Sequence, residues 1–407
     1  MQKSRLPFQF ILITLVLNAM GIGIIMPVMP DLIRDVTGTD LAHAAIWGGV
    51  LATSFAVMQF LFSPLIGNLS DRFGRRPVLL ASLLVVTLDY LLMATANTIW
   101  LLLAARIIGG IATATQSTAS AFMADVSAPG EKAKNFALTS AAFGLGFVLG
   151  PVLGGVLGSF GPRAPFLAAA TLTAANFAFG WLVMRESLPE SLRRPFEWRR
   201  ANPLGALRHI ARLPGLAPLL LVVFLNQIAF FVYPSIWAYF TRARYGWSPA
   251  MVGYSLALFG LSMVLVQGWL IRPILARLGE RGAVFLGFSI EILSFLLIAL
   301  IPNGLIVLAL TPLSALGGIA GPALQAILSH RVAANQQGEL QGLLSSIGSL
   351  GMILSPLIMT QTFAFFSSPA APLHLPGAPF LLSALLIGIC ILILRRALRT
   401  LPVPEGT

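Results

Sequence analysis

Three ionisable residues lie inside long apolar segments of the sequence: Asp89, Arg106 and Glu291. A charged side chain within a membrane-spanning segment is costly and usually serves function. Asp89 precedes the turn at Asn97–Thr98 by about eight residues and Arg106 follows it by about as many. Both therefore lie about 12 Å from the same membrane surface and can pair. Such a pair could hold two helices together, or line a cavity in which a proton or a substrate competes for Asp89; the two roles are compatible.

Glu291 lies near the middle of an apolar segment that contains no basic residue. A buried carboxyl without a cation beside it is well suited to bind and release a proton. We therefore expect proton coupling or cation binding at Glu291. The structural alternative is a protonated acid that is hydrogen-bonded to a neighbouring helix.

The composition is that of an integral membrane protein. Of the 407 residues, 57% are hydrophobic and only 10% are charged, with a mean hydropathy of +0.88, whereas a soluble domain carries about 25% charge. The net charge of +12 reflects basic loops that alternate to one side of the membrane, and not a nucleic-acid surface. The single cysteine, Cys390, excludes a disulfide framework, and the four histidines are scattered, so we expect no metal site.

Twelve apolar segments are each long enough to cross a bilayer. An even number places both termini on one side, and the basic residues near both termini predict that this side is cytoplasmic. The expected spans are 8–29, 44–66, 77–97, 99–122, 134–158, 164–184, 218–240, 250–271, 283–301, 304–328, 341–363 and 378–395.

The chain divides into two similar halves, 1–184 and 214–407, joined by a polar linker at 185–213 that is rich in arginine and proline. Gly279 follows Gly74, and Pro356 follows Pro151, at the same offset of 205 residues. The Gly-Gly-Ile-Ala sequence at 109–112 recurs at 317–320. These repeats predict an all-α membrane fold of two parallel six-helix bundles, with a substrate site near the midplane between them.

The stretch Gly67–Arg76 is the most distinctive in the chain, and we expect it to be a short charged loop between the second and third spans. Its two glycines allow close backbone approach or positive φ. The stretch contains a single acid among three arginines. The residues to which we assign a conformational role here are Gly67, Asp71, Arg72, Gly74 and Arg75.

In the fifth span, glycines recur every four residues at Gly146, Gly150 and Gly154, with Pro151 and Gly155 beside them. This spacing gives one bare helix face against which another helix can pack closely. Pro151 removes one backbone hydrogen bond and bends the span. Close packing alone is the alternative to a role in transport.

Polar and aromatic residues inside other spans are candidates for a substrate-binding wall, although several of them could serve helix packing instead. They are Asn18, Gln59, Gln116, Asn226, Gln227, Phe231, Gln267 and Gln325.

The stretch Gly67–Arg76 resembles the signature loop of the major facilitator superfamily, and the glycine-rich fifth span resembles the antiporter motif of its drug/proton exchangers. Further segments resemble the bacterial tetracycline efflux proteins, which export a metal–tetracycline complex in exchange for protons. The resemblance implies that Asp89, Arg106 and Glu291 match intramembrane charges of that family. Asn18 stands where those exporters carry an aspartate, so another antibiotic, a siderophore or a metabolite is about as compatible with the sequence. The segments are Leu17–Pro27, Ser70–Leu80, Leu88–Leu92, Phe143–Gly146 and Gln337–Leu343.

The same resemblance implies a conformational latch on the cytoplasmic side. Arg75 is expected to pair with Asp125 at the end of the fourth span. Asp71 is expected near the positive N-terminal end of the eleventh span, around Gly338–Leu343.

We therefore expect a proton-coupled exporter of a small amphipathic compound in the bacterial inner membrane, acting as a monomer by alternating access. An uptake symporter or facilitator is the alternative. The sequence offers no catalytic constellation and no phosphate-binding loop, so we expect neither an enzyme nor an ATP-driven pump. No cofactor and no nucleic-acid partner are expected, and the energy would come from the proton gradient.

Overall fold

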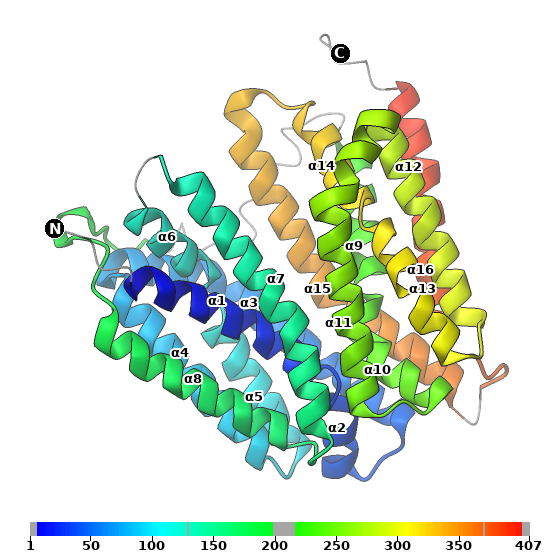
Figure 1. Ribbon diagram of the computed structural model, residues 1–407, viewed down its shortest axis with the longest axis horizontal. Helices are drawn as coiled ribbons and strands as arrows, with labels where there is room; N and C mark the ends of the chain where they lie inside the picture. The colour runs from blue at the N-terminus through cyan, green and yellow to red at the C-terminus, as the bar shows by residue number, and fades with distance from the viewer. Residues whose placement is uncertain (1–5, 128–129, 198–215, 369–370, 401–407) are drawn as a thin grey trace. The chain divides into compact units, whose positions relative to one another are not determined.

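The computed structural model describes residues 6–127, 130–197, 216–368 and 371–400, and all the regular structure in these residues is helical (Figure 1). Eleven of its helical runs are long and apolar enough to cross a membrane. One of them, Pro249–Leu300, has 52 residues. At 1.5 Å per residue it is about 78 Å long, more than twice the roughly 30 Å of a bilayer core, and it therefore holds two of the expected spans. The prediction of an all-α, twelve-span membrane protein is confirmed.

Several expected spans are made of two helices. Short breaks interrupt the fourth span at 113–115, the seventh at Phe231 and the tenth at 318–319. The helices before the linker are α1 Leu6–Ile25, α2 Met29–Thr37, α3 Leu41–Phe73, α4 Arg75–Thr95, α5 Ile99–Ala112, α6 Gln116–Val126, α7 Lys132–Gly158 and α8 Ala164–Val183. After it come α9 Ala217–Phe230, α10 Val232–Tyr245, α11 Pro249–Leu265, α12 Ile271–Leu300, α13 Gly304–Gly317, α14 Ala320–Ser329, α15 Gln337–Ser367 and α16 Ala378–Thr400.

The expectation of a loop over Gly67–Arg76 is wrong. Helix α3 continues through this stretch to Phe73, and α4 begins at Arg75, so that Gly74 alone separates the two helices. The reason is that no residue between Gly67 and Phe73 stops a helix, whereas Gly74 adopts φ 102°, which favours glycine. The related stretch 272–281 is likewise helical, with a kink at Gly279, where φ is 64°.

Contacts between residues divide the chain into two compact units. Unit 1 comprises 1–39, 54–203 and 248–257, and unit 2 comprises 40–53, 204–247 and 258–407. Helices α3 and α11 therefore each contribute one part to each unit. The change from unit 1 to unit 2 within the expected linker falls at 203–204, in the segment 198–215 that lies outside the described residues.

In unit 1, α1 packs along α7 and α8, and α4 packs along α5, α6 and α8 (Figure 1). Side chains from α1, α4 and α6 form a core that also takes in Met184, just after α8. Phe10, Phe122 and Met123 are fully buried in it. Because lipid is as apolar as these side chains, close packing rather than removal from water holds such helices together.

In unit 2, α9 packs against α15 and α16, and α12 packs against α13, α14 and α16. An aromatic cluster joins α10, α12 and α16. Phe380 lies 4.9 Å from Phe240 and 6.3 Å from Phe295, and Tyr233 lies 5.6 Å from Phe295, measured between ring centroids. Rings at these separations and angles attract beyond their buried area, so the three helices have a fixed register around the polar groups described below.

Candidate functional site

Asp89 on α4 and Arg106 on α5 form a buried ion pair in unit 1. Arg106 Nη2 donates to Asp89 Oδ2 over 2.9 Å, and the two residues are 5% and 4% exposed, respectively. The guanidinium also lies 5.3 Å from the centre of the Phe55 ring. Within the part of the chain that is described, Asp89 Oδ1 and Arg106 Nε have no hydrogen-bond partner. The pair therefore joins two adjacent helices, and one carboxylate oxygen of Asp89 is left without a hydrogen-bond partner among the described residues.

Glycine brings the next turn of α5 close to that carboxylate. A Cβ atom placed on Gly109 would lie 2.6 Å from Asp89 Oδ2. That separation is shorter than any ordinary contact, so only glycine allows α5 to pass the acid at this distance.

Glu291 on α12 is buried in unit 2, and it forms no ion pair among the described residues. Its Oε2 atom has no hydrogen-bond partner there either. Among the described residues, two groups that ordinarily carry no charge interact with it electrostatically, the Tyr233 hydroxyl from α10 and the Cys390 thiol from α16. In the part of the chain that is described, this carboxyl therefore has no cation beside it, unlike that of Asp89.

The expected cavity residues lie in different surroundings. Gln59 donates to the Thr113 hydroxyl over 3.5 Å, and Gln325 donates to Gln341 over 3.1 Å, so both are engaged with neighbouring helices. Asn226 Oδ1 is buried without a hydrogen-bond partner in the described chain. The remaining members are Asn18, Gln227 and Phe231, which are partly buried, Gln267, which is exposed in the π-helical turn Val266–Leu270, and Gln116, whose side chain lies outside the described residues.

Arg75 is the centre of the charged cluster at the start of α4. Its Nη1 atom lies 2.5 Å from Asp71 Oδ1 and 3.0 Å from Ser70 Oγ, and its Nε lies 3.5 Å from Asp125 Oδ2. The structure thus brings together the pair expected from the resemblance, Arg75 and Asp125, and adds Asp71 to it. Arg72 points elsewhere and lies over the Phe73 ring, 5.1 Å from its centre.

Sequence reasoning missed Glu186, which is the second residue of the linker and caps α4. Its carboxylate accepts hydrogen bonds from the backbone N–H groups of Arg75 at 2.9 Å, Arg76 at 3.1 Å and Leu188 at 3.0 Å. The first N–H groups of a helix have no partner within it and attract negative charge. The neighbouring Ser187 hydroxyl donates to Asp125 over 3.0 Å. The linker therefore begins as part of the charged cluster.

Replacing Glu186 with alanine is expected to lower the free energy of unfolding by about 1–2 kcal/mol, because the first N–H groups of α4 lose their acceptor. The measurement is the unfolding midpoint of purified protein in detergent. The matched control is Glu190→Ala on the same segment, because the Glu190 side chain is 88% exposed and, among the described residues, it pairs with Arg193 alone, at 3.5 Å. Equal midpoints for the two variants would contradict the capping role.

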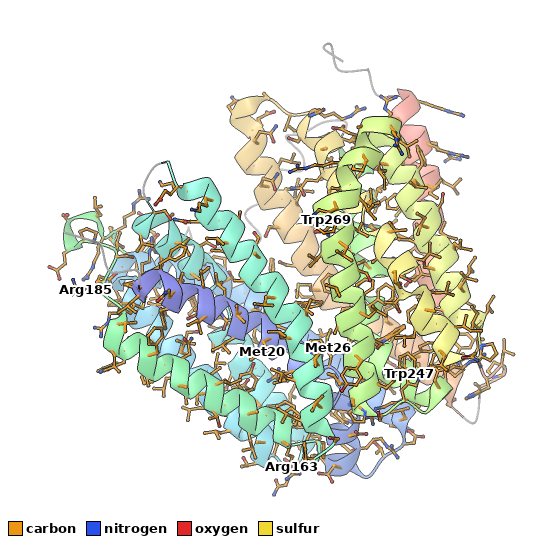
Figure 2. The ribbon with its side chains drawn as sticks, in the orientation of Figure 1. Met20, Met26, Arg163, Arg185, Trp247 and Trp269 are labelled. Carbon is orange, nitrogen blue, oxygen red and sulfur yellow. The ribbon has the colours of Figure 1, made fainter. Side chains whose placement is uncertain are left out.

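The glycine face of α7 packs against α1. A Cβ placed on Gly146, Gly150 or Gly154 would collide with a carbonyl oxygen of α1. For Gly150 this oxygen belongs to Met20, at 2.5 Å; Met20 is labelled in Figure 2. Gly155 faces the other way, and its Cβ would lie 2.6 Å from the Pro249 carbonyl oxygen at the start of α11. Both contacts lie within unit 1. The glycines of α7 therefore allow both α1 and α11 to approach it to backbone distance.

The chain is similar to known transport proteins along almost its whole length. A family model described as the Major Facilitator Superfamily matches residues 11–356 and 219–407. The class C tetracycline resistance protein of Escherichia coli is 42% identical over 394 residues, which cover 97% of this chain and 98% of that protein. The class B tetracycline resistance protein of the same organism is 38% identical and covers 86% and 87%. Multidrug resistance protein 2 of Bacillus subtilis is 28% identical and covers 88% of each.

Solved structures agree with this fold. The human organic anion transporter MFSD10 (TETRAN) matches with a TM-score of 0.67 and 27% identity over 96% of this chain and 99% of that chain. A bacterial homologue of the human lysosomal transporter Spinster, in an inward-facing and unoccupied conformation, matches with a TM-score of 0.77 over 97% and 96%. Its identity is 16%, so it supports the fold alone.

Proposed function

We propose that this chain, which belongs to the major facilitator superfamily and within it to the tetracycline resistance type of proton-coupled exporters, expels a small amphipathic drug by alternating access. The relatives that support this reading are resistance proteins, and their names favour export over uptake by a symporter or facilitator. Tetracycline is the first substrate to test. Another antibiotic, a siderophore or a metabolite should be tested next, because the chain has Asn18 in the first span where the tetracycline exporters have a carboxylate.

The observation that carries the proposal is the contrast between the two buried acids. Asp89 is neutralised by Arg106 at 2.9 Å, whereas Glu291 has no cation among the described residues. We assign the proton-carrying step to Glu291. Asp89 and Arg106 neutralise each other's charge within unit 1. The Asp89 oxygen that lacks a hydrogen-bond partner is the second candidate to accept a proton. The proton gradient supplies the energy, and no bound cofactor or metal is needed.

The proposal includes the membrane, the orientation of the chain in it and the oligomeric state. The protein lies in the bacterial inner membrane, with both termini and the cluster around Arg75 on the cytoplasmic side, because arginine-rich segments stay there. It works as a monomer of two six-helix halves. Arg75, which pairs with Asp71 and Asp125, belongs to the expected latch together with Gly67, Arg72 and Gly74. When the cytoplasmic side closes, Asp71 is expected to reach the N-terminal end of the eleventh span. The polar residues from Asn18 to Gln325 are candidates for the substrate wall.

The test is substrate-triggered proton movement in everted membrane vesicles energised to an acidic interior. Tetracycline with Mg²⁺ is added to vesicles with the unaltered protein, with Glu291→Gln, or with Glu190→Gln as the matched control. Proton efflux is expected with the unaltered protein and with Glu190→Gln, and is expected to be lost in Glu291→Gln. Transport that persists unchanged in Glu291→Gln, or after the proton gradient is collapsed, would contradict the proposal.

A further inference from the structure

Each half of the chain places a buried acid against a glycine at the same point of its repeat. In unit 1 the acid is Asp89 and the glycine is Gly109; in unit 2 they are Glu291 and Gly317. A Cβ on Gly109 would lie 2.6 Å from the Asp89 carboxylate, and a Cβ on Gly317 would collide with Glu291 Cγ. Both glycines open the same Gly-Gly-Ile-Ala sequence, 208 residues apart. The two acids therefore occupy equivalent sites on different helices.

The two sites differ first in the residue one turn before the glycine. Three positions before Gly109, and so one helical turn away on the same face, is Arg106. Three positions before Gly317 the chain has Ser314. Ser314 is buried, and its hydroxyl interacts with that of Tyr233 from α10. The cation that neutralises the first acid is thus replaced by a neutral hydroxyl at the second.

The acid itself has moved by one turn. The offset of 205 residues that relates Gly74 to Gly279 would relate Asp89 to position 294, which is a serine. Ser294 is buried, and its hydroxyl has no hydrogen-bond partner within the described segments. Glu291 precedes Ser294 by three residues, so it lies on the same face of α12. Its side chain is one methylene longer, and it still meets the glycine of α13.

We infer that Ser314 is a positioning residue for proton exchange: it stands where the equivalent site has its arginine, and its neutrality, with Tyr233 held beside it, keeps the Glu291 carboxyl unpaired. Among the described residues, Gly317 from α13 lies against the Glu291 side chain, Tyr233 from α10 and Cys390 from α16 interact with its charge, and none of the three is a cation. The inference rests on the proposed role of Glu291 as the proton carrier.

The experiment introduces at position 314 the cation that the equivalent site has in Arg106. Ser314→Arg places a guanidinium at the position that pairs in unit 1, and it should hold Glu291 in its ionised form. Gradient-driven accumulation of labelled tetracycline with Mg²⁺ in everted vesicles is then expected to fall at least about tenfold. The reason is that an opposite charge within about 4–6 Å favours the ionised carboxylate over the protonated form by that factor or more. Exchange of labelled for unlabelled tetracycline without a gradient should persist, since the substrate-loaded cycle needs no proton. Ser314→Met, which has bulk without charge, should keep most of the driven transport.

A stability measurement covers the case in which the arginine prevents transport for another reason. If the introduced guanidinium pairs with Glu291, the variant that combines Ser314→Arg with Glu291→Gln should unfold at a lower temperature than Ser314→Arg alone, because its buried charge has no partner. If the combined variant is equally or more stable, no pair forms and the inference is wrong.

The outcomes separate this inference from the proposed function. Full driven transport in Ser314→Arg, together with its loss in Glu291→Gln, overturns the role of Ser314 alone. Full driven transport in Glu291→Gln overturns the role of Glu291 as proton carrier, and with it the premise of the inference. Loss of gradient-free exchange in Ser314→Arg but not in Ser314→Met would show that the cation blocks the substrate path, which also contradicts the inference.

Discussion

Replacing Arg106 with leucine is expected to lower the free energy of unfolding by about 3–5 kcal/mol, the usual cost of leaving one partner of a buried ion pair alone. Asp89 is 4% exposed, and its Oδ2 atom receives the 2.9 Å hydrogen bond from Arg106. Its Oδ1 atom has no hydrogen-bond partner in the described chain. No other cation among the described residues pairs with this carboxylate, so the charge would be left in an apolar interior. The measurement is the unfolding midpoint of the purified protein in mixed micelles.

Two controls separate the pair from a general effect of removing an arginine. Arg163→Leu removes an arginine of the same unit, labelled in Figure 2. Its partner, Asp35 at 3.0 Å, has a side chain that is 53% exposed, and an exposed pair is worth about 1 kcal/mol or less. Adding Asp89→Asn to Arg106→Leu should recover most of the loss, because the buried charge is then gone. If Arg106→Leu lowers the free energy of unfolding no more than Arg163→Leu does, the pair contributes little to stability. Arg106 would then serve transport alone.

The ion pair could be predicted because the sequence contains the needed geometry. Asp89 and Arg106 are equally far from one short turn, and two helices joined by a short turn run antiparallel. Glu291 could be recognised for a similar reason, since an acid in a long apolar run has few uses. The number of spans followed from the lengths of the apolar runs. All of these are local properties of the chain, which a single sequence displays directly.

The parts that could not be predicted depend on contacts between distant residues or on neutral side chains. Glu186 caps a helix that begins 111 residues earlier. It is one acid in an arginine-rich linker, and nothing in the neighbouring sequence indicates that contact. The stretch Gly67–Phe73 resembled a loop because of its charges, yet charge does not end a helix and Gly74 does. Ser314 is an ordinary residue until its site is compared with that of Arg106. That Ser314 stands where the other half has a cation can be recognised only when the two positions are known to be equivalent.

Replacing Gly154 with leucine is expected to cost about 3 kcal/mol or more and to abolish transport, because a side chain there overpacks a contact between two backbones. A Cβ at this position would collide with the Ile24 carbonyl oxygen, and it would lie 2.8 Å from the Ile24 carbonyl carbon and Cα. A flexible side chain could turn aside, but the backbone of α1 is itself packed along α7 and α8. The two helices would have to separate along much of their length. Unfolding midpoints and tetracycline transport in everted vesicles report the two effects.

Gly144 supplies the matched control, since it is a glycine of the same helix with no neighbouring atom within 4 Å of a Cβ placed on it. Gly144→Leu loses the same backbone freedom in the unfolded chain and gains the same helix propensity, so the difference between the two variants isolates the contact with α1. If Gly154→Leu is as stable as Gly144→Leu but no longer transports, the glycine face acts in a conformational change rather than in holding unit 1 together. If both variants are stable and both transport, the close contact is dispensable, and the recurrence of glycine every four residues in α7 requires another explanation.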